Sequence, residues 1–399
     1  MRHLLFLLFL PLYLFADLQK ISVQFEWIHQ FEYAGFYTAI EKGYYKEAGL
    51  EVSLQEFSNG INVSEDVLNE KATFGISSSS IILERLKNKP VVLVASYFKQ
   101  NALALVTSKE IKQLSDLKQK KIMLTQHQAD GTGLGVMLHQ NGLTKENYQF
   151  VEHSFNINAF LSSQVDAVSV FLTNEIFYLK QSNKDYNIFI PSDYGIYSYD
   201  LELFTSSNVA HKDPQMVKNF TEATNKGWEY ALDHQEEIIN LIYNKYSKKK
   251  SKEALAFEAK ETERLFKRNS FTIGSVIPEL VRLNAVIFEQ LGLVKESLNL
   301  DAFLSSYIFT NWKKLSFTKE ELAFIKQNKT FKIANEMDWE PFDYNQFAKP
   351  LGLSIDYIKL LFDKAGLKYE FIHGYTWEEL LTLFENKKID VMPAMYKTQ

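Results

Sequence analysis

The sequence predicts an α/β protein in which two α/β lobes enclose a hinged cleft, followed by a second, incomplete α/β domain. Apolar strands alternate with amphipathic helices from position 21 to 97 and again from 121 to 190, which is typical of βαβ units around mostly parallel sheets. Residues 201–207 form a strand that returns toward the first unit, so two chain crossings join the lobes. A new strand–helix alternation begins after position 316, and its sheet is half built at position 399.

The first sixteen residues have the pattern of a secretory signal peptide. Arg2 and His3 precede an apolar run from Leu4 to Phe15, and Ala16 supplies the small residue before cleavage. An uncleaved N-terminal anchor is the alternative, although the run is short for a membrane span. The chain has no cysteine, which excludes disulfides, thiolate catalysis and a lipid-anchored lipoprotein. An exported protein without disulfides fits the bacterial periplasm.

Composition and charge argue against a nucleic-acid partner, and the sequence shows no motif for a cofactor. The formal net charge is −5, so we expect no nucleic-acid partner. The basic run at 245–252 is most simply a solvated helix junction, with contact to an anionic surface as the alternative. No metal cluster, cofactor motif or nucleophile stands out, and none is predicted.

The first domain is predicted to span residues 17–312. Its lobe 1 covers about 20–105 and 205–305, and its lobe 2 covers about 106–204. The strands predicted in it lie at 21–27, 50–57, 72–76, 91–97, 121–125, 148–153, 165–171, 186–190 and 201–207. The main helices lie at 35–48, 63–69, 79–87, 156–163, 174–181, 236–246, 252–266 and 276–291. Glycine at 49 ends the first of these helices.

The second domain is predicted to span residues 313–399. A capping box at Thr318 and Glu321 opens it. Strands are expected at 330–335, 368–372 and 389–394, with helices at 354–365 and 377–385. A half-built sheet exposes unpaired edges, so we expect this part to be unstable.

The richest candidate site is the aromatic turn after the first strand. Trp27, Tyr33 and Tyr37 offer ring faces for stacking a small planar ligand, and His29 and Gln30 offer polar groups for its edge. Core packing is the alternative for each of these rings, Trp27 included, and a surface turn is the alternative for His29.

Other candidates come from the ends of later elements. Ser77 and Ser78 stand at a strand-to-helix junction, where capping the helix is the simpler role. Glu175 follows a buried strand, and its carboxylate could pair with an amidine-like ring edge. The alternative is an exposed residue in the first turn of a helix, where the helix dipole favours a negative charge. Tyr197 offers a ring from lobe 2. The glycine-rich loop at 131–135 is a weak signal for anion binding.

Residues 21–304 resemble the THI5/NMT1-like family of periplasmic binding folds. The likeness rests on 27–37 with 41–45, and on the shorter motifs at 74–76, 173–175, 191–196, 226–232 and 257–259. It implies a periplasmic-binding-protein fold of type II, a thiamine-precursor pyrimidine or similar heterocycle as ligand, and an ABC permease as partner.

The second unit resembles the first half of a family 3 solute-binding domain. The marks are 338–342, 352–356, 377–381 and 388–392, and the resemblance places Asp338, Trp339 and Phe342 in a half-cleft. Tandem domains in this order are similar to the periplasmic sensors of membrane histidine kinases and diguanylate cyclases. The expectation is therefore a truncated product or a fragment of a membrane-tethered kinase or cyclase.

The same family includes a pyrimidine synthase of thiamine biosynthesis, which is the enzymatic alternative. The resemblance implies a cysteine-rich iron motif and a pyridoxal-phosphate lysine in that enzyme. Here residues 197–204 contain no cysteine, and Gly75-Ile76-Ser77 contains no lysine. The chain is therefore predicted to bind and not to catalyse.

Overall fold

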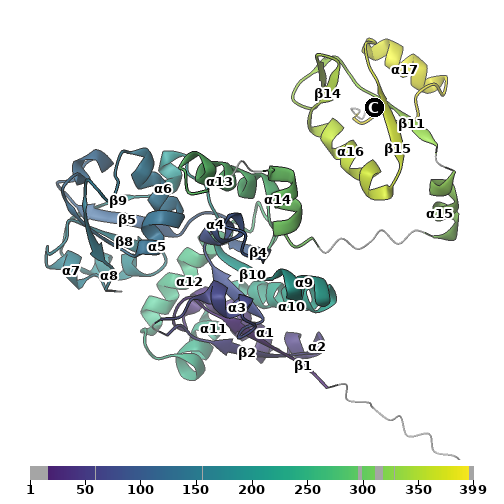
Figure 1. Ribbon diagram of the computed structural model, residues 1–399. Coiled ribbons are helices and arrows are strands. Elements are labelled where there is room, and N and C mark those ends of the chain that lie inside the picture. Colours follow the sequence, from purple (N-terminus) through teal and green to yellow (C-terminus); the bar gives the residue numbers. More distant parts are fainter. Residues whose placement is uncertain are drawn as a thin grey trace, which may run out of the picture. The chain divides into compact units, whose positions relative to one another are not determined.

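A computed structural model describes residues 17–58, 60–154, 156–294, 299–310, 318–327 and 329–394 (Figure 1). The chain divides into two compact units, residues 1–311 and 312–399. The signal peptide predicted at 1–16 and the junction predicted at 312/313 lie outside the described residues. Within the described part of the chain, no helix is long and apolar enough to cross a bilayer.

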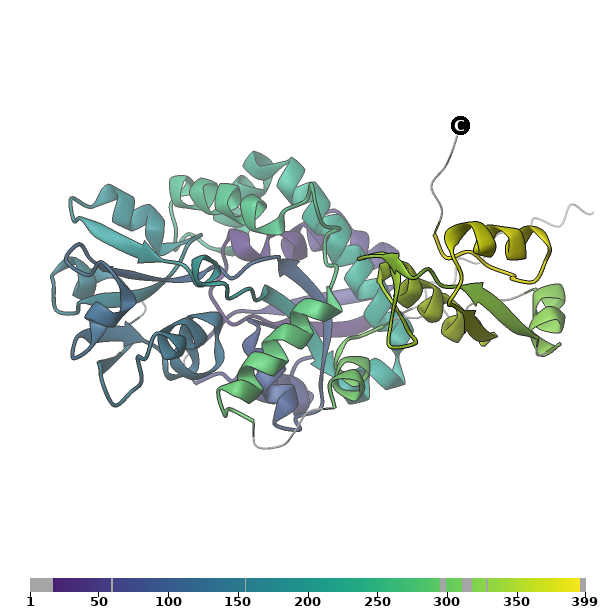
Figure 2. The same ribbon diagram turned by 90° about the horizontal axis from the view of Figure 1, so that it is seen from above.

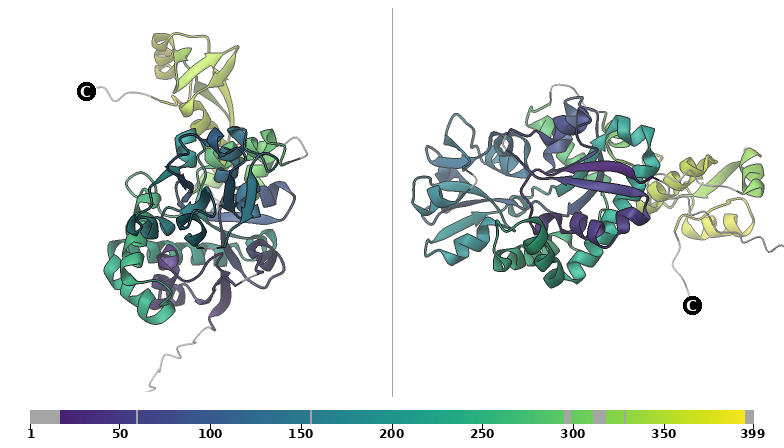
Figure 3. Two further views of the ribbon diagram at one scale, coloured as in Figure 1. Left: turned by 90° about the vertical axis from the view of Figure 1, so that its left-hand side faces the viewer. Right: turned by 90° about the horizontal axis from the view of Figure 1, so that it is seen from below.

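Lobe 1 of the first unit is built on a five-stranded sheet of order β2-β1-β3-β10-β4. Its strands are β1 (Gln19–Gln24), β2 (Leu50–Gln55), β3 (Phe74–Ser77), β4 (Val91–Phe98) and β10 (Asp200–Ser206). β1 runs parallel to β2 and β3. Strands β1 and β2 lie side by side in the right-hand view of Figure 3. β10 is antiparallel to both of its neighbours.

Lobe 2 repeats this plan with a sheet of order β7-β6-β8-β5-β9. Its strands are β5 (Leu103–Ser108), β6 (Lys121–Leu124), β7 (Gln149–Glu152), β8 (Ala167–Phe171) and β9 (Tyr186–Phe189). Here β5 is the antiparallel strand, placed between β8 and β9. Figure 2 shows these blue strands apart from the purple strands of lobe 1. The sequence analysis missed β5.

The chain crosses between the lobes twice, from β4 to β5 and from β9 to β10. The second crossing returns the chain to lobe 1 as predicted, which confirms the two-lobed α/β fold. The helices of lobe 1 up to β4 are α1 (Ala34–Glu41), α2 (Tyr44–Glu47), α3 (Val63–Leu68) and α4 (Ser80–Leu86). Those of lobe 2 are α5 (Gln126–Gly131), α6 (Gly133–Gln140), α7 (Asn158–Leu161) and α8 (Glu175–Gln181).

The helix predicted at 35–48 is two helices, so that prediction is wrong in its continuity. Gly43 adopts a positive φ of 79° between α1 and α2, which ends the first helix. Residues 242–246 continue α11 as a π-helical turn.

The remaining helices follow β10 and brace lobe 1. They are α9 (Ser207–Lys212), α10 (Pro214–Asp233), α11 (Gln235–Leu241), α12 (Lys252–Phe266), α13 (Pro278–Gln290) and α14 (Leu300–Tyr307). The bounds of α12 are those predicted. A glycine pair lets α10 approach α1 closely: a Cβ on Gly35 would lie 2.3 Å from Cγ of Trp228, and one on Gly227 would lie 2.1 Å from the Gly35 carbonyl oxygen.

The second unit contains a parallel pair, β11 (Thr330–Ala334) with β15 (Lys368–Ile372), and three short antiparallel strands. The latter are β12 (Asp338–Trp339), β13 (Asp343–Gln346) and β14 (Lys349–Leu351). Its helices are α15 (Lys319–Lys326), α16 (Leu353–Ala365) and α17 (Trp377–Glu385), and the predicted capping box opens α15. The strand predicted at 389–394 is wrong, because only a single bridge joins Val391 to Ile333.

Candidate functional site: a cavity between two lobes

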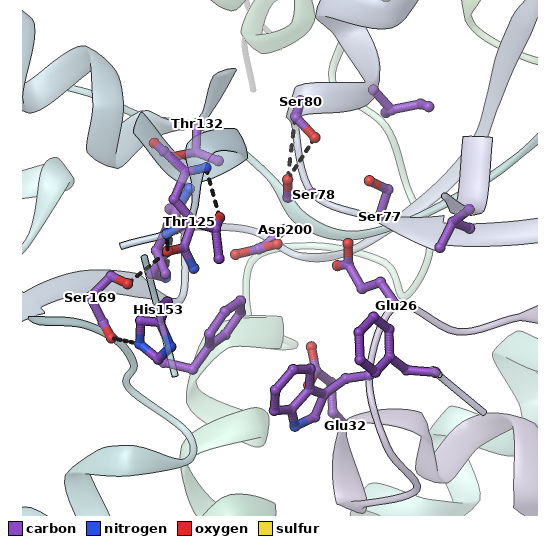
Figure 4. A pocket seen from close by; sticks show the side chains of 18 of the residues that line it. Glu26, Glu32, Ser77, Ser78, Ser80, Thr125, Thr132, His153, Ser169 and Asp200 are labelled. Atoms are coloured by element: carbon purple, nitrogen blue, oxygen red, sulfur yellow. Dashed lines mark hydrogen bonds between the residues drawn. The ribbon is translucent and has the colours of Figure 1, made fainter. Parts of the chain in front are cut away.

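A cavity of about 500 Å³ lies between the two lobes of the first unit. Residues that follow β1 and β3 line it from lobe 1, together with the first residue of β10. From lobe 2 it is lined by the first residues of α5, by Thr132 before α6, and by the ends of β7 and β8 (Figure 4). Ligands of α/β proteins commonly bind where parallel strands end, and this volume suits a small molecule.

Aromatic side chains supply the flat surfaces of the cavity. Trp27 and Phe57 pair with ring centroids 5.6 Å apart on the lobe 1 side. Tyr33 also lines the cavity and stacks on Phe25 at 3.9 Å, which fixes its ring. Phe171 contributes a ring at the end of β8. The half-buried rings of Trp27, Phe57 and Phe171 can stack on a planar ligand.

Six of the nine residues predicted for the first-domain site line this cavity. They are Trp27, Gln30, Tyr33, Ser77, Ser78 and Glu175. Ser78 also hydrogen bonds Ser80 at 2.9 Å between hydroxyl oxygens, next to the start of α4. The binding roles of all six stay predictions.

The other three predicted residues do not line the cavity. His29 and Tyr37 bind each other, with 2.8 Å between Nδ1 and the hydroxyl oxygen, and the Tyr37 ring packs 4.2 Å from that of Tyr246. They belong to the lobe 1 packing beside the π-helical turn. Tyr197 is 51% exposed, and its carbonyl oxygen accepts from Asn284 at 2.9 Å.

Carboxyl groups gather on the lobe 1 wall of the cavity. Burial and the nearby charge of Asp200 raise the pKa of Glu26 well above its usual range. Burial, with the charges of Glu258 and Asp200, raises the pKa of Glu32 to about 8. Burial also raises the pKa of Asp200 to about 7, although two backbone N–H groups donate to its carboxylate and oppose this rise. Figure 4 shows Glu26 and Asp200 reaching into the same part of the cavity.

A hydrogen-bond network orders the lobe 2 wall. Gln128 Oε1 accepts from the Thr125 backbone N–H at 2.9 Å and from the Ser169 hydroxyl at 2.7 Å. His153 Nε2 lies 3.0 Å from the Ser169 carbonyl oxygen. Glu175 accepts from the Phe171 backbone N–H at 2.8 Å, and burial raises its pKa.

Sequence reasoning missed the carboxyl groups of Glu26, Glu32 and Asp200. Glu26 directly precedes Trp27 at the end of β1, so its position carried a usable signal. Asp200 begins β10, the strand that returns to lobe 1. Acidic residues are normally exposed, so their burial here follows from tertiary packing, which the sequence pattern does not display.

In the second unit, Asp338, Trp339 and Phe342 are the residues predicted to line a half-cleft. Asp338 is exposed, and the rings of Trp339 and Phe342 pack 5.5 Å apart. Asp343, the next residue after Phe342, is buried and accepts from Asn335 Nδ2 at 2.7 Å. A ligand role for these three residues stays a prediction.

Two α/β lobes joined by two crossings around a lined cavity define the class of two-lobed solute-binding folds. A profile of the NMT1/THI5-like family matches residues 30–238, more than half of the chain, and the chain belongs to this family. A profile of bacterial extracellular solute-binding proteins, family 3, matches residues 331–399. Both resemblances drawn from the sequence are thereby confirmed.

Named relatives are similar to the first unit. The formylaminopyrimidine-binding protein of Halalkalibacterium halodurans is 26% identical over 232 residues, 56% of this chain and 70% of that protein. A putative thiamine biosynthesis protein of Haemophilus influenzae is 26% identical over 224 residues, 55% and 71% of the two chains. The aliphatic sulphonate binding protein of Escherichia coli shares the fold, with a TM-score of 0.57, 16% identity, and coverage of 75% and 96%.

Proposed function

We propose that the protein is a periplasmic solute-binding protein whose first unit closes its two lobes around a small planar nitrogen heterocycle. A thiamine-precursor pyrimidine is the ligand that we favour. One observation carries the proposal: an interlobe cavity of about 500 Å³ combines aromatic faces with polar groups from both lobes.

The chemistry of the wall suits an aminopyrimidine. Such a ring has two faces for stacking, which Trp27, Tyr33 and Phe171 can meet. Its edge carries amino donors and ring-nitrogen acceptors, which match the carboxyl groups of lobe 1 and the hydroxyl groups of Ser77 and Ser78. The relatives named for formylaminopyrimidine binding and thiamine biosynthesis support this class of ligand.

Closure of the lobes supplies the functional signal. A ligand that touches both walls binds the closed form better than the open form and shifts the population toward closure. Either an ABC permease or a membrane-tethered kinase or cyclase output could read that change. The appended family 3 match favours the tethered sensor, because a transport receptor needs only the first unit.

The synthase alternative is less favoured on the residues present. Ser77 ends β3 at the position where the resemblance implies a pyridoxal-phosphate lysine, and the chain contains no cysteine for the implied iron motif. We propose binding without turnover. Release of a modified pyrimidine from the purified protein would contradict this.

The test is calorimetric titration of the full chain with hydroxymethylpyrimidine, its formylamino analogue and thiamine. We expect micromolar or tighter binding of a pyrimidine. Trp27→Ala should weaken it by roughly tenfold to a hundredfold, since a stacking face and its buried area are lost. Tyr197→Ala serves as the matched control, because Tyr197 is exposed and outside the lining, and should bind normally. No heat with any of the three compounds would refute the pyrimidine assignment.

A further inference from the structure

The cavity wall has an excess of acidic groups. Among the described residues that line it, none is Lys or Arg, whereas six carry carboxyl groups: Glu26, Glu32, Glu84, Glu152, Glu175 and Asp200. Glu84 already pairs with Lys89, and Glu152 is exposed. Glu175 accepts two hydrogen bonds within lobe 2, from Phe171 and Asn174. On the lobe 1 wall, Asp200 accepts from two backbone N–H groups and Glu32 accepts from Gln30. Among the described residues, however, no lysine or arginine forms an ion pair with Glu26, Glu32 or Asp200, so no cation compensates these three groups.

Among the described residues two lysines are buried, and both are already engaged. Lys250 donates to Glu258 at 2.9 Å, and that carboxylate also accepts from the Glu32 backbone N–H. Lys99 Nζ donates to the carbonyl oxygens of Ser96 at 2.7 Å and Ser275 at 2.5 Å. Each lysine has protein partners of its own and does not line the cavity. Among the described residues neither lysine forms an ion pair with Glu26, Glu32 or Asp200, although the charge of Lys250 partly opposes the rise in the pKa of Glu32.

Two further polar atoms on the same wall have no hydrogen-bond partner. Gln30 is 2% exposed and Tyr33 is 0% exposed, and both line the cavity. The Gln30 amide nitrogen donates to Glu32, but its Oε1 has no donor, and the Tyr33 hydroxyl is also unpaired. Buried polar groups normally find partners. An amide oxygen and ionised carboxylates only accept hydrogen bonds, and a neighbouring cation favours the ionised form of a carboxyl group, so the missing partner is a positively charged group rich in N–H donors.

We propose that the solute carries a positively charged nitrogen that bears hydrogens, as in an ammonium, an amidinium or a protonated aminopyrimidine, and that Glu26, Glu32 and Asp200 bind it. This inference rests on the proposed function and specifies the chemical class of its ligand. Charge-assisted hydrogen bonds to carboxylates are about twice as strong as neutral ones. When they are ionised, the same carboxyl groups repel an anionic solute.

A matched ring series tests the charge separately from the pyrimidine. Benzamidinium, benzamide and benzenesulfonate share one ring and carry positive, zero and negative charge. We expect calorimetric titration of the full chain to give benzamidinium an affinity at least about tenfold above that of benzamide, with no binding of benzenesulfonate. Equal or tighter binding of benzamide or benzenesulfonate, or no binding of benzamidinium, would overturn the inference.

Two pyrimidines of different charge distinguish a failure of the charge assignment from a failure of the proposed function. Tighter binding of aminomethylpyrimidine, a cation, than of neutral hydroxymethylpyrimidine supports the charge assignment. Equal affinities leave the proposed function standing and overturn this inference. Binding of benzamidinium without either pyrimidine supports the charge assignment and refutes the pyrimidine.

Charge-neutral variants locate the partner. Glu26→Gln keeps the size of the side chain and should cost benzamidinium about tenfold in affinity while benzamide binds unchanged. Glu51→Gln is the control, because Glu51 is exposed near the start of β2, at the opposite end of the sheet. Glu32→Gln provides a second variant if the first fails to fold. A loss shared by both ring compounds would indicate a structural role and overturn the assignment.

Discussion

The two walls of the cavity differ in how their polar groups are satisfied. On the lobe 2 wall, Gln128, Ser169 and Glu175 form hydrogen bonds within the lobe. On the lobe 1 wall, the Tyr33 hydroxyl and Gln30 Oε1 have no partner. The difference indicates a division of roles, in which lobe 2 offers an ordered surface and lobe 1 keeps unsatisfied groups for the ligand. Such sites lower the stability of the free protein.

The comparison makes opposite predictions for the two walls. Neutralising an acidic group of lobe 1 should stabilise the free protein, because it removes repulsion and buried charge. Removing a group of lobe 2 should destabilise it, because a buried partner is left unpaired.

The largest effect is expected at Glu202, which lies two residues after Asp200 on β10 and is buried in lobe 1 without lining the cavity. Its side chain is fully buried, neither carboxylate oxygen has a partner, and burial raises its pKa from 4.5 to about 8. The folded state therefore holds a proton that the unfolded state releases, and stability falls as pH rises between these values. Glu202→Gln should increase the free energy of unfolding by about 2 kcal/mol more near pH 8 than near pH 6.

Calorimetric melting of the first unit at several pH values measures this effect. Glu51→Gln, at an exposed position, should follow the wild type across the range. A stabilisation by Glu202→Gln that is independent of pH would show that Glu202 does not hold the proton in the folded state, and would contradict the expectation that buried carboxyl groups of lobe 1 destabilise the free protein.

A smaller effect of opposite sign is expected at Glu175 in lobe 2. Its oxygens accept from the Phe171 backbone N–H at 2.8 Å and from Asn174 Nδ2 at 2.7 Å. Glu175→Gln turns one acceptor into a donor that faces another donor, so we expect a loss of about 1.5 kcal/mol in urea unfolding. Glu26→Gln, the matched change on lobe 1, should not destabilise. The same sign for both variants would remove the distinction.

Ser169→Ala should cost about 1 kcal/mol, since it removes the hydroxyl that donates to Gln128 Oε1 at 2.7 Å. Ser115→Ala, at an exposed position, is the control. Ligand affinity should change little, because the affected bond orders the wall and leaves its aromatic faces in place. Unchanged stability in urea unfolding would mean that the network contributes nothing.

The smallest effect is expected at the surface of lobe 2. Lys109 and Asp185 form an ion pair at 2.6 Å, with side chains 59% and 71% exposed. Solvent screens such pairs, so Lys109→Ala should leave both the melting temperature and the ligand affinity unchanged. A clear shift of the melting temperature would show that surface charge contributes to the stability of lobe 2.

The sequence predicted those elements whose signals are local. Helix α12 begins after the N-cap Ser251 and follows one apolar face, and its predicted bounds match the structure. Strand β5 was missed because only four residues separate its first residue, Leu103, from Phe98 at the end of β4, with no helix between them. An antiparallel strand in the other lobe is set by long-range pairing, which periodicity does not reveal.

The part of the candidate site that has local sequence signals was also predictable. Trp27 and Gln30 follow a strand end, and the structure places both on the cavity. Tyr197 and Tyr199 alternate just before β10, so one is exposed while the other is buried and accepts from the Ile277 backbone N–H. The choice between them depends on packing against the residues before α13, and the sequence pattern alone does not give it.

The most direct test of the account is the distance between the two lobes with and without ligand. The chain has no cysteine, so Ser58→Cys and Asn156→Cys would give two unique spin-label sites, close in sequence to the lining residues Phe57 and His153. We expect the electron–electron distance distribution to shift to shorter values when a binding pyrimidine is added, and Trp27→Ala to need more ligand for the same shift. Saturating binding with an unchanged distribution would contradict closure around the interlobe cavity.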